Sequence, residues 1–313
     1  MRWEVGGGRW EVGGGRWEGE TMSSSGIAPL HPAFVDAALS RELEGAEAAA
    51  SRDFCEAAAR VYPDASIRVI ECSGGFGLHY GAADPLNAVK GVGLNGAVDV
   101  GEWDALEEMF RGAGSPVVID LSPFADAPFV AMLGVRGYTI GSFETVMCRR
   151  LDVGAMFPEH KLASGVRIEP VGAARAHEWT GVVGVGFANG GEPMKFAVDF
   201  GLVRQQLARS ITLLATVDGV PAGGAAMSIT GPIAHMAGAA VLPKFRRRGI
   251  QQQLTAARLR LAGERGCTWA KLDVQGGSAS YRNAVRAGFQ VAYTRPQMVR
   301  TWHKQTDLRE DSL

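Results

Sequence analysis

The sequence lacks the features that mark several specialised classes of protein. Only four cysteines occur in 313 residues, and they show no metal-site pattern (Cys55, Cys72, Cys148 and Cys267). We expect them to be reduced core residues of an intracellular protein. No apolar run reaches the roughly 20 residues that a membrane-spanning helix needs, and the N-terminal stretch has no apolar signal region. We therefore expect a cytoplasmic protein that does not enter a membrane.

An excess of charge of one sign is missing as well. The net charge of −1 argues against general nucleic-acid binding. No Gly-Lys-Ser or Gly-Lys-Thr is present, which excludes a Walker-type nucleotide site, and we find no Ser-His-Asp or Cys-His arrangement. We expect no metal. Hydrophobic residues make up 46% and charged residues 21% of the chain, which is typical of a soluble globular protein.

The N-terminal stretch repeats Arg-Trp-Glu-Val-Gly-Gly-Gly with a period of seven. Each unit offers two apolar side chains against three glycines, which is too little apolar surface to order so flexible a backbone. We therefore expect residues 1–26 to be a disordered tail outside the fold.

Two series of alternating helical and strand patterns follow, and they predict a mixed α/β chain of two domains. Residues 27–151 contain predicted helices at 32–61, 100–112 and 127–134, and predicted strands at 66–72, 74–80, 87–94, 116–121 and 137–149. Residues 152–165 are irregular, with Gly154 and Pro158, and are interpreted as a linker.

The second series spans residues 166–313. It contains predicted strands at 166–170, 211–217, 221–229, 234–242 and 268–274, predicted helices at 173–186, 196–207, 249–264 and 278–287, and a closing strand pair at 290–302. Asp218-Gly219 predicts a tight hairpin turn between the second and third of these strands.

The most informative stretch runs from Ala234 to Ile250. An apolar strand pattern ends at Pro243, three arginines and Gly249 follow, and a helical pattern begins at once. The first N–H groups of a helix have no intrahelical partner, the helix dipole is positive there, and glycine allows close approach of a ligand. Three adjacent guanidinium groups favour phosphate over carboxylate. The residues alone leave several phosphate ligands open.

Two motifs in this half resemble those of the GNAT superfamily of acyl-CoA-dependent N-acyltransferases. The first is Val241-Leu242-Pro243 ahead of Arg246-Arg247-Arg248-Gly249-Ile250-Gln251, and the second is Ser278-Ala279-Ser280-Tyr281-Arg282-Asn283 ahead of Gly288-Phe289. The resemblance covers about residues 166–302. Gln251 departs from the small residue that the family has at that position, so its side chain must turn away from the ligand.

The resemblance implies a site for acetyl-CoA. In that family the strand that carries the Val241 position splays from its neighbour, so the backbone of Ala239 and Val241 would pair with the pantetheine arm. The Val241 N–H would polarise the thioester carbonyl, and the amides of the arginine turn would hold the pyrophosphate. The full set of expected cofactor-binding residues is Ala239, Val241, Leu242, Arg246, Arg247, Arg248, Gly249, Ile250, Gln251, Ser280 and Asn283.

The resemblance also implies two tandem GNAT-like domains, each a mostly antiparallel twisted sheet flanked by helices. We expect the first domain to be degenerate, because it lacks an anion cradle. Asp120-Leu121-Ser122-Pro123 stands where the second half has its arginine turn, and a carboxylate there repels phosphate. The first domain is expected to shape the cleft and to cover an edge of the second domain's sheet.

Three residues are candidates for the acid–base chemistry. His235 is the favoured base, since strand alternation places residues 235, 237, 239 and 241 on one face; the alternative is a histidine that packs against the sheet. Glu192 is a second candidate, although a solvated loop carboxylate is the favoured interpretation for it. Many members have a tyrosine acid where this chain has Ala284. Tyr281, nearly one helical turn earlier, is the candidate acid here, although a packed helix aromatic is the slightly favoured interpretation. Ser280, Asn283 or water are the remaining donors to the sulfur.

The leading function is therefore transfer of an acetyl group from acetyl-CoA to a primary amine of a small molecule. The alternatives are a CoA-binding or regulatory module without transfer activity, and a protein lysine or N-terminal acetyltransferase. We expect a monomer or a homodimer. Two further sets of residues have structural interpretations: Trp179, Phe187, Phe196 and Phe200 as core, and Arg258, Arg260 and Arg265 as a solvated helix face.

Overall fold

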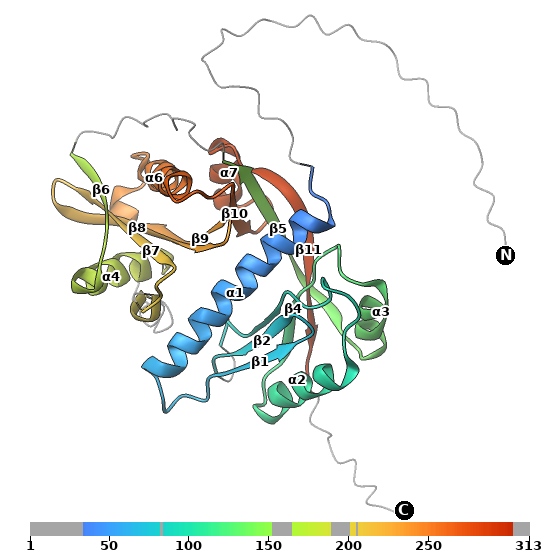
Figure 1. The fold of residues 1–313 in the computed structure, drawn as a ribbon. Helices are drawn as coiled ribbons and strands as arrows, with labels where there is room; N and C mark the ends of the chain where they lie inside the picture. The colour runs from blue at the N-terminus through green and yellow to red at the C-terminus, as the bar shows by residue number, and fades with distance from the viewer. Residues whose placement is uncertain (1–33, 82–83, 152–164, 189–200, 205, 303–313) are drawn as a thin grey trace, which may run out of the picture. The chain divides into compact units, whose positions relative to one another are not determined.

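The computed structural model describes residues 34–81, 84–151, 165–188, 201–204 and 206–302 (Figure 1). The predicted tail at 1–26, Glu192, Phe196 and Phe200 lie outside the described residues, as does almost all of the predicted linker. In the part of the chain that is described, no helix has the length and apolarity that crossing a membrane requires.

The helices and strands alternate in the order that the sequence predicts. The first half contains α1 (Ala37–Val61), β1 (Arg68–Cys72), β2 (Gly75–His79), β3 (Ala88–Lys90), α2 (Val100–Gly112), β4 (Val117–Asp120), α3 (Ala127–Val135) and β5 (Thr139–Arg150). The second half contains β6 (Val166–Pro170), η1 (Ala173–Arg175), α4 (Ala176–Phe187), β7 (Ser210–Val217), β8 (Val220–Thr230), β9 (Ile233–Val241), η2 (Pro243–Phe245), α6 (Ile250–Glu264), β10 (Trp269–Val274), α7 (Ala279–Arg286) and β11 (Gln290–Arg300).

Local chemistry explains the turn and helix boundaries. Asp218 and Gly219 both have positive φ, at 50° and 81°, as the two central residues of a tight hairpin between β7 and β8 require. Asp36 begins α1, because its carboxylate accepts a hydrogen bond from the Leu39 N–H at 2.8 Å. Ser278 begins α7 in the same way through the Tyr281 N–H at 3.0 Å.

The eleven strands of the described residues belong to one sheet, in the order β1-β2-β3-β4-β11-β5-β10-β9-β8-β7-β6. Most neighbouring pairs are antiparallel; β3 with β4 and β9 with β10 are parallel. The mixed α/β fold class with a mostly antiparallel sheet is therefore confirmed. Two details differ from the prediction: β3 is a short strand that ends at Lys90, and residues 290–300 form one long strand instead of a strand pair.

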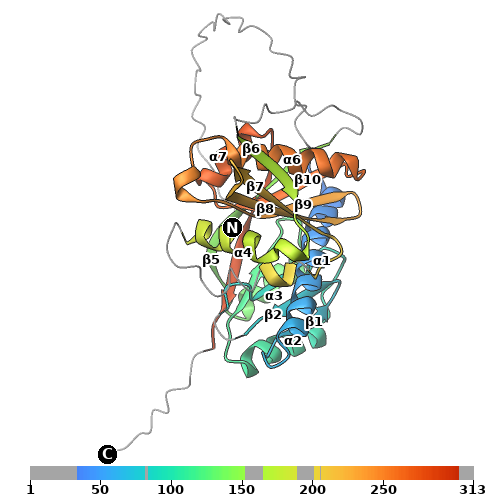
Figure 2. The same ribbon diagram turned by 90° about the vertical axis from the view of Figure 1, so that its left-hand side faces the viewer.

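The two halves exchange their last strands. β5, from the first half, pairs with β10 of the second half along Thr145–Arg150, and β11, from the second half, pairs with β4 of the first half along Gln297–Arg300. β5 and β11 also pair with each other over most of their length, and they run from one half into the other (Figure 2). The predicted covering of the second sheet's edge by the first half is thus achieved by a shared strand.

The helices divide between the two faces of the sheet. α1 packs against strands of both halves, β1, β2 and β3 on one side and β8 and β9 on the other (Figure 1). α4 packs on β8 and β9 through Trp179, which is fully buried and donates to the Leu213 and Ala225 carbonyls. α6 packs on β8 and β9 from the opposite face. The neighbours Val241 and Ala240 of β9 show this, since Val241 packs in a core cluster with α6 residues and Ala240 in one with α4 residues. The four cysteines are buried free thiols, as predicted.

Candidate functional site

The parallel strands β9 and β10 diverge partway along their length. Their register ends at the pair Lys271–His235, although β9 continues to Val241 and β10 to Val274. Beyond His235, none of the described strands pairs with the side of β9 that faces away from β8. The splay expected from the resemblance is therefore present, and it leaves a free backbone edge on β9.

A β-bulge at Gly238 changes which way the residues of β9 face. The pairing of β8 with β9 shifts register between Gly224–Ala240 and Ala226–Ala237, and Gly238 has a φ of 61°. Before the bulge, Met236 packs in the cluster with α6 residues; after it, Val241 packs with α6 residues and Ala240 packs with α4.

The prediction that residues 235, 237, 239 and 241 share one face is consequently wrong. His235 alternates with Met236 and so lies on the face of α1 and α4, whereas Val241 lies on the face of α6. Simple alternation fails because the bulge inserts one residue. The side chains of His235 and Val241 thus lie on opposite faces of the sheet.

The N–H of Val241 points into the gap between β9 and β10. The next residue, Leu242, donates its N–H to the Ala222 carbonyl next to β8 at 2.9 Å. Since successive N–H groups along a strand point to opposite sides, the Val241 N–H points away from β8, and the Ala239 N–H does the same. Both donors therefore lie on the free edge of β9.

The arginine turn joins β9 to α6 and presents the beginning of that helix. Arg247 and Gly249 have positive φ, at 65° and 74°, and no side chain caps α6. Ile250 is buried in the core beneath the turn, and Gln251 is half-buried. The first N–H groups of α6 are therefore free of side-chain acceptors among the described residues, which is the condition for an anion site.

The three arginines of the turn differ in their contacts. Arg246 donates from Nε to the Val241 carbonyl and from Nη2 to the Gly186 carbonyl, both at 3.1 Å, and so ties the turn to β9 and α4. Arg247 and Arg248 are exposed, with the Arg248 guanidinium 5.5 Å from the ring centre of Phe245. All three arginines are exposed, and Arg246 differs from Arg247 and Arg248 in that it also holds the loop through two backbone carbonyls.

The corresponding helix of the first half is capped by a carboxylate. By topology, β3–α2–β4 is the counterpart of β9–α6–β10, because both place a helix between two parallel strands. Asp99 begins α2 and accepts from the Glu102 N–H at 2.9 Å. The counterpart of the arginine turn is thus residues 91–99, not Asp120–Pro123 as predicted; Asp120 lies at the end of β4, where it pairs with Lys90.

His235 is paired with a buried carboxylate. Its Nε2 lies 3.1 Å from Oδ2 of Asp273, and the two side chains are 15% and 10% exposed. Burial raises the pKa of the Asp273 carboxyl, but Lys271, Arg295 and the hydrogen bond from His235 outweigh it and bring the pKa to about 2. An ionised Asp273 accepts a hydrogen bond from the Nε2–H of His235, which leaves the lone pair on Nδ1; no described residue bonds to Nδ1.

The candidates on α7 lie beside the end of β10. The Tyr281 ring packs against the cluster that contains Met236, on the face of α6. Ser280 is exposed, Asn283 is half-buried, and Ala284 is buried in the core, where its methyl group offers no proton. Tyr281 therefore lies on the face of the sheet opposite His235.

Sequence reasoning missed Asp273 and misplaced Arg258. Lys271 and Asp273 alternate with apolar residues in β10, and this polar face was the available signal for a buried charged pair.

Arg258, predicted to be solvated, is 3% exposed and donates to the Ala226 carbonyl at 3.1 Å. Helix periodicity alone did not reveal that it points at the sheet. Phe187, predicted as core, is 48% exposed.

Residues 187–289 match the model of the family described as "Acetyltransferase (GNAT) family". No curated protein matches the chain. A GCN5-related N-acetyltransferase from Kribbella flavida has a similar structure with a TM-score of 0.54 at 22% identity, over 84% of this chain and 98% of that one.

Two further solved structures show the same likeness of fold. A GCN5-related N-acetyltransferase from Sphaerobacter thermophilus gives a TM-score of 0.51 at 18% identity, over 64% of this chain and 66% of that one. A tandem GNAT protein from the clavulanic acid biosynthesis pathway gives a TM-score of 0.50 at 16% identity, over 66% and 69% of the two chains.

Proposed function

Because the chain carries a GNAT acyltransferase domain at residues 187–289, we propose that it transfers an acetyl group from acetyl-CoA to a primary amine of a small molecule. One observation supports this most directly: the free edge of β9 is followed, after η2 and the arginine turn, by the uncapped N-terminus of α6. A strand edge offers hydrogen bonds to the two amides of a pantetheine arm, and a helix N-terminus offers them to a pyrophosphate.

Acetyl-CoA would lie along the gap between β9 and β10. The amides of Ala239 and Val241 would bond to the pantetheine arm, and those from Arg247 to Gln251 to the pyrophosphate, with Arg247 and Arg248 adding charge. The sequence between Lys244 and Gly263 contains no acidic residue, so the cradle carries no carboxylate of its own. Arg246 contributes through the loop that it holds in place.

The acetyl transfer would be a direct attack on the thioester. The amine nitrogen forms a bond to the carbonyl carbon, the Val241 N–H stabilises the negative oxygen, and the C–S bond breaks. His235 takes the amine proton on Nδ1 while Nε2 stays bonded to Asp273. The thiolate takes a proton from Tyr281 or from water, with Ser280 and Asn283 beside it. His235 and Tyr281 thus act from opposite faces of the gap.

Removing the exposed charges of the turn tests the cofactor site. In an R247A/R248A double variant we expect acetyl-CoA binding, measured by calorimetry, to weaken about tenfold at low salt and less at high salt. R260A is the matched control, because Arg260 is exposed on the same helix but pairs with Glu264 in its last turn. Absence of any heat from the wild-type protein up to millimolar acetyl-CoA would refute the proposal.

A CoA-binding module without transfer activity is the second candidate. It is favoured by Ala284, whose buried methyl group stands where many family members have the tyrosine acid. The two functions are separated by incubating the protein with acetyl-CoA and a panel of amines and following free thiol. Binding without thiol release across a broad panel would identify the module, and release with any amine would identify the enzyme.

A further inference from the structure

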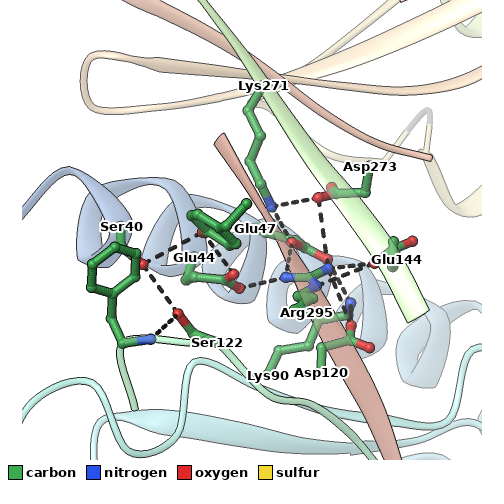
Figure 3. Close-up of polar contacts among 12 residues, drawn as sticks. Ser40, Glu44, Glu47, Lys90, Asp120, Ser122, Glu144, Lys271, Asp273 and Arg295 are labelled. Atoms are coloured by element: carbon green, nitrogen blue, oxygen red, sulfur yellow. Dashed lines mark hydrogen bonds and ion pairs between the residues drawn. The ribbon is translucent and has the colours of Figure 1, made fainter. Parts of the chain in front are cut away.

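A network of buried charges joins the two halves of the chain. Arg295 lies at its centre, completely buried, and its guanidinium reaches Glu44 at 2.5 Å, Glu47 at 3.0 Å and Glu144 at 2.7 Å (Figure 3). The charged members are Glu44 and Glu47 of α1, Lys90 of β3, Asp120 of β4, Glu144 of β5, Lys271 and Asp273 of β10, and Arg295 of β11. Each half of the chain therefore supplies charges that the other half neutralises.

One arm of this network ends at His235. Asp273 lies between two partners: its Oδ2 is 3.1 Å from Nε2 of His235, and its Oδ1 is 3.1 Å from Nζ of Lys271. Lys271 is fully buried, and Glu47 pairs with its ammonium group from α1. Within the described residues, Glu47 and Asp273 are the two carboxylates in ion-pair contact with Lys271.

The pKa of Glu47 shows that this carboxyl group is charged within the network. Burial alone would raise the pKa of the Glu47 carboxyl, but Arg295, Lys271 and Lys90 hold it well below its usual range. Glu47 is therefore ionised at neutral pH. Without its charge, Asp273 would be the sole ion-pair partner of the Lys271 ammonium among the described residues, and that attraction competes with the hydrogen bond to His235.

We propose that Glu47 is a positioning residue for acetyl transfer, through which the first half of the chain holds the His235–Asp273 pair in place. This rests on the proposed function, since it assigns His235 the role of base. Glu47 acts on Lys271, Lys271 is thereby kept from drawing Asp273 away, and Asp273 keeps the Nε2 proton in place. The Nδ1 lone pair then stays available for the acceptor amine. The first half thus contributes to the reaction although it lacks a cofactor cradle.

Replacing Glu47 by Gln is the primary test. In E47Q we expect kcat to fall roughly 10- to 100-fold, the size of effect seen when a group that orients a metal ligand is lost, while the Kd of acetyl-CoA changes less than about twofold. E44Q is the matched control: Glu44 lies one helical turn earlier, is equally buried and pairs with Arg295, yet has no ion pair with Lys271. Its kcat is expected to stay within about threefold of wild type.

A second variant separates positioning from a merely structural role. In E47Q/K271M the unpaired ammonium is also gone, so Asp273 loses the closer of the two cations at Oδ1 and keeps only Arg295, at 3.7 Å. We therefore expect kcat to recover to within about tenfold of wild type. A structural role for Glu47 would give no such recovery. The double variant also replaces a buried ion pair by two uncharged side chains, which folded proteins often tolerate.

Nuclear magnetic resonance of the histidine rings gives a readout that needs no turnover. His235, assigned with H235Q, should carry its proton on Nε2 in wild type, in E44Q and in E47Q/K271M, and should lose this preference in E47Q. The same tautomer in E47Q as in wild type, or unchanged kcat in E47Q, would overturn the positioning role. Absence of acetyl transfer by the wild-type protein would instead refute the proposed function, while the ring spectra would still test the link from Glu47 to His235.

Discussion

Single residues of the same type have very different roles in this chain, and their surroundings explain why. Arg295 is fully buried and compensated by five carboxylates within ion-pair distance, those of Glu44, Glu47, Asp120, Glu144 and Asp273. Arg258 is also buried, but it donates to backbone and hydroxyl oxygens, and burial lowers its pKa to about 10. Both remain charged at neutral pH. Arg247 and Arg248, by contrast, stay in water, where a ligand can reach them.

The cysteines give a prediction at this scale. Burial raises the pKa of Cys72 and Cys148 to about 11 and that of Cys55 to about 12, and it also raises the pKa of Cys267. At pH 8 the thiolate fraction of Cys72 or Cys148 is on the order of one in a thousand, so we expect the native protein to react very slowly with Ellman's reagent. All four thiols should react after denaturation.

This matters for the assay of acetyl transfer, because the reagent would then report CoA thiol alone. Rapid titration of any of the four thiols in the native protein would contradict the burial of the cysteines.

At the scale of the elements, the two halves differ most in how a helix begins. The carboxylate of Asp99 occupies the N-terminus of α2, whereas Gly249 leaves that of α6 open. An anion is repelled from the first helix and attracted to the second, although both follow the first strand of a parallel pair. The two helices thus differ at their capping position, and we propose that this position, together with the arginines of the turn, makes the two halves differ in anion binding.

Alanine at Gly249 tests this element. G249A should destabilise the fold by about 1 kcal/mol, because alanine is strained at a φ of 74°, and should also weaken acetyl-CoA binding through its methyl group. G219A is the control, since Gly219 has a φ of 81°, lies in the β7–β8 hairpin and has no atom within 4 Å of an added Cβ. Both free energies of unfolding come from denaturant titration; equal loss of binding in both variants would refute the role of Gly249.

The sequence predicted the elements well because their signals are local. Hydrophobic periodicity and the turn residues located α2 at residues 100–112 and the β7–β8 hairpin around Asp218-Gly219. The arginine turn and the Gly-Phe motif likewise indicated the half of the chain that the family model matches. The face of His235 was missed because one bulge at Gly238 reverses alternation, and the pairing of His235 with Asp273 depends on strand neighbours 38 residues apart. Such neighbours follow from the register of the sheet, which local patterns do not contain.

At the scale of the whole molecule, the exchange of β5 and β11 makes each half incomplete without the other. Removing residues 1–151 would strip β10 of its antiparallel neighbour, and removing the second half would do the same to β4. It would also leave Arg295 or its partners Glu44 and Glu47 unpaired, and breaking one buried ion pair in this way costs about 3–5 kcal/mol.

Expression of the halves tests this interdependence. We expect residues 27–151 and residues 166–313, expressed separately, to show no cooperative thermal transition, and the two expressed together to regain one. A full-length chain cleaved between Leu151 and Gly165 is the control, and its halves should remain associated through the shared sheet. A sharp transition for either half alone would show that the shared strands are dispensable.

The place of β11 in the sheet has a consequence for how the chain is made. Residues 290–300 lie between β4 and β5 in the sheet, yet they are synthesised some 140 to 170 residues later. The first half therefore leaves the ribosome with an open strand edge at β4. This edge stays unpaired until almost the whole second half, including β11, has been synthesised. Open edges of this kind invite pairing with other chains. Synthesis of this protein thus includes a long interval in which a partly folded nascent chain needs protection, and slow translation of the second half should lower its soluble yield.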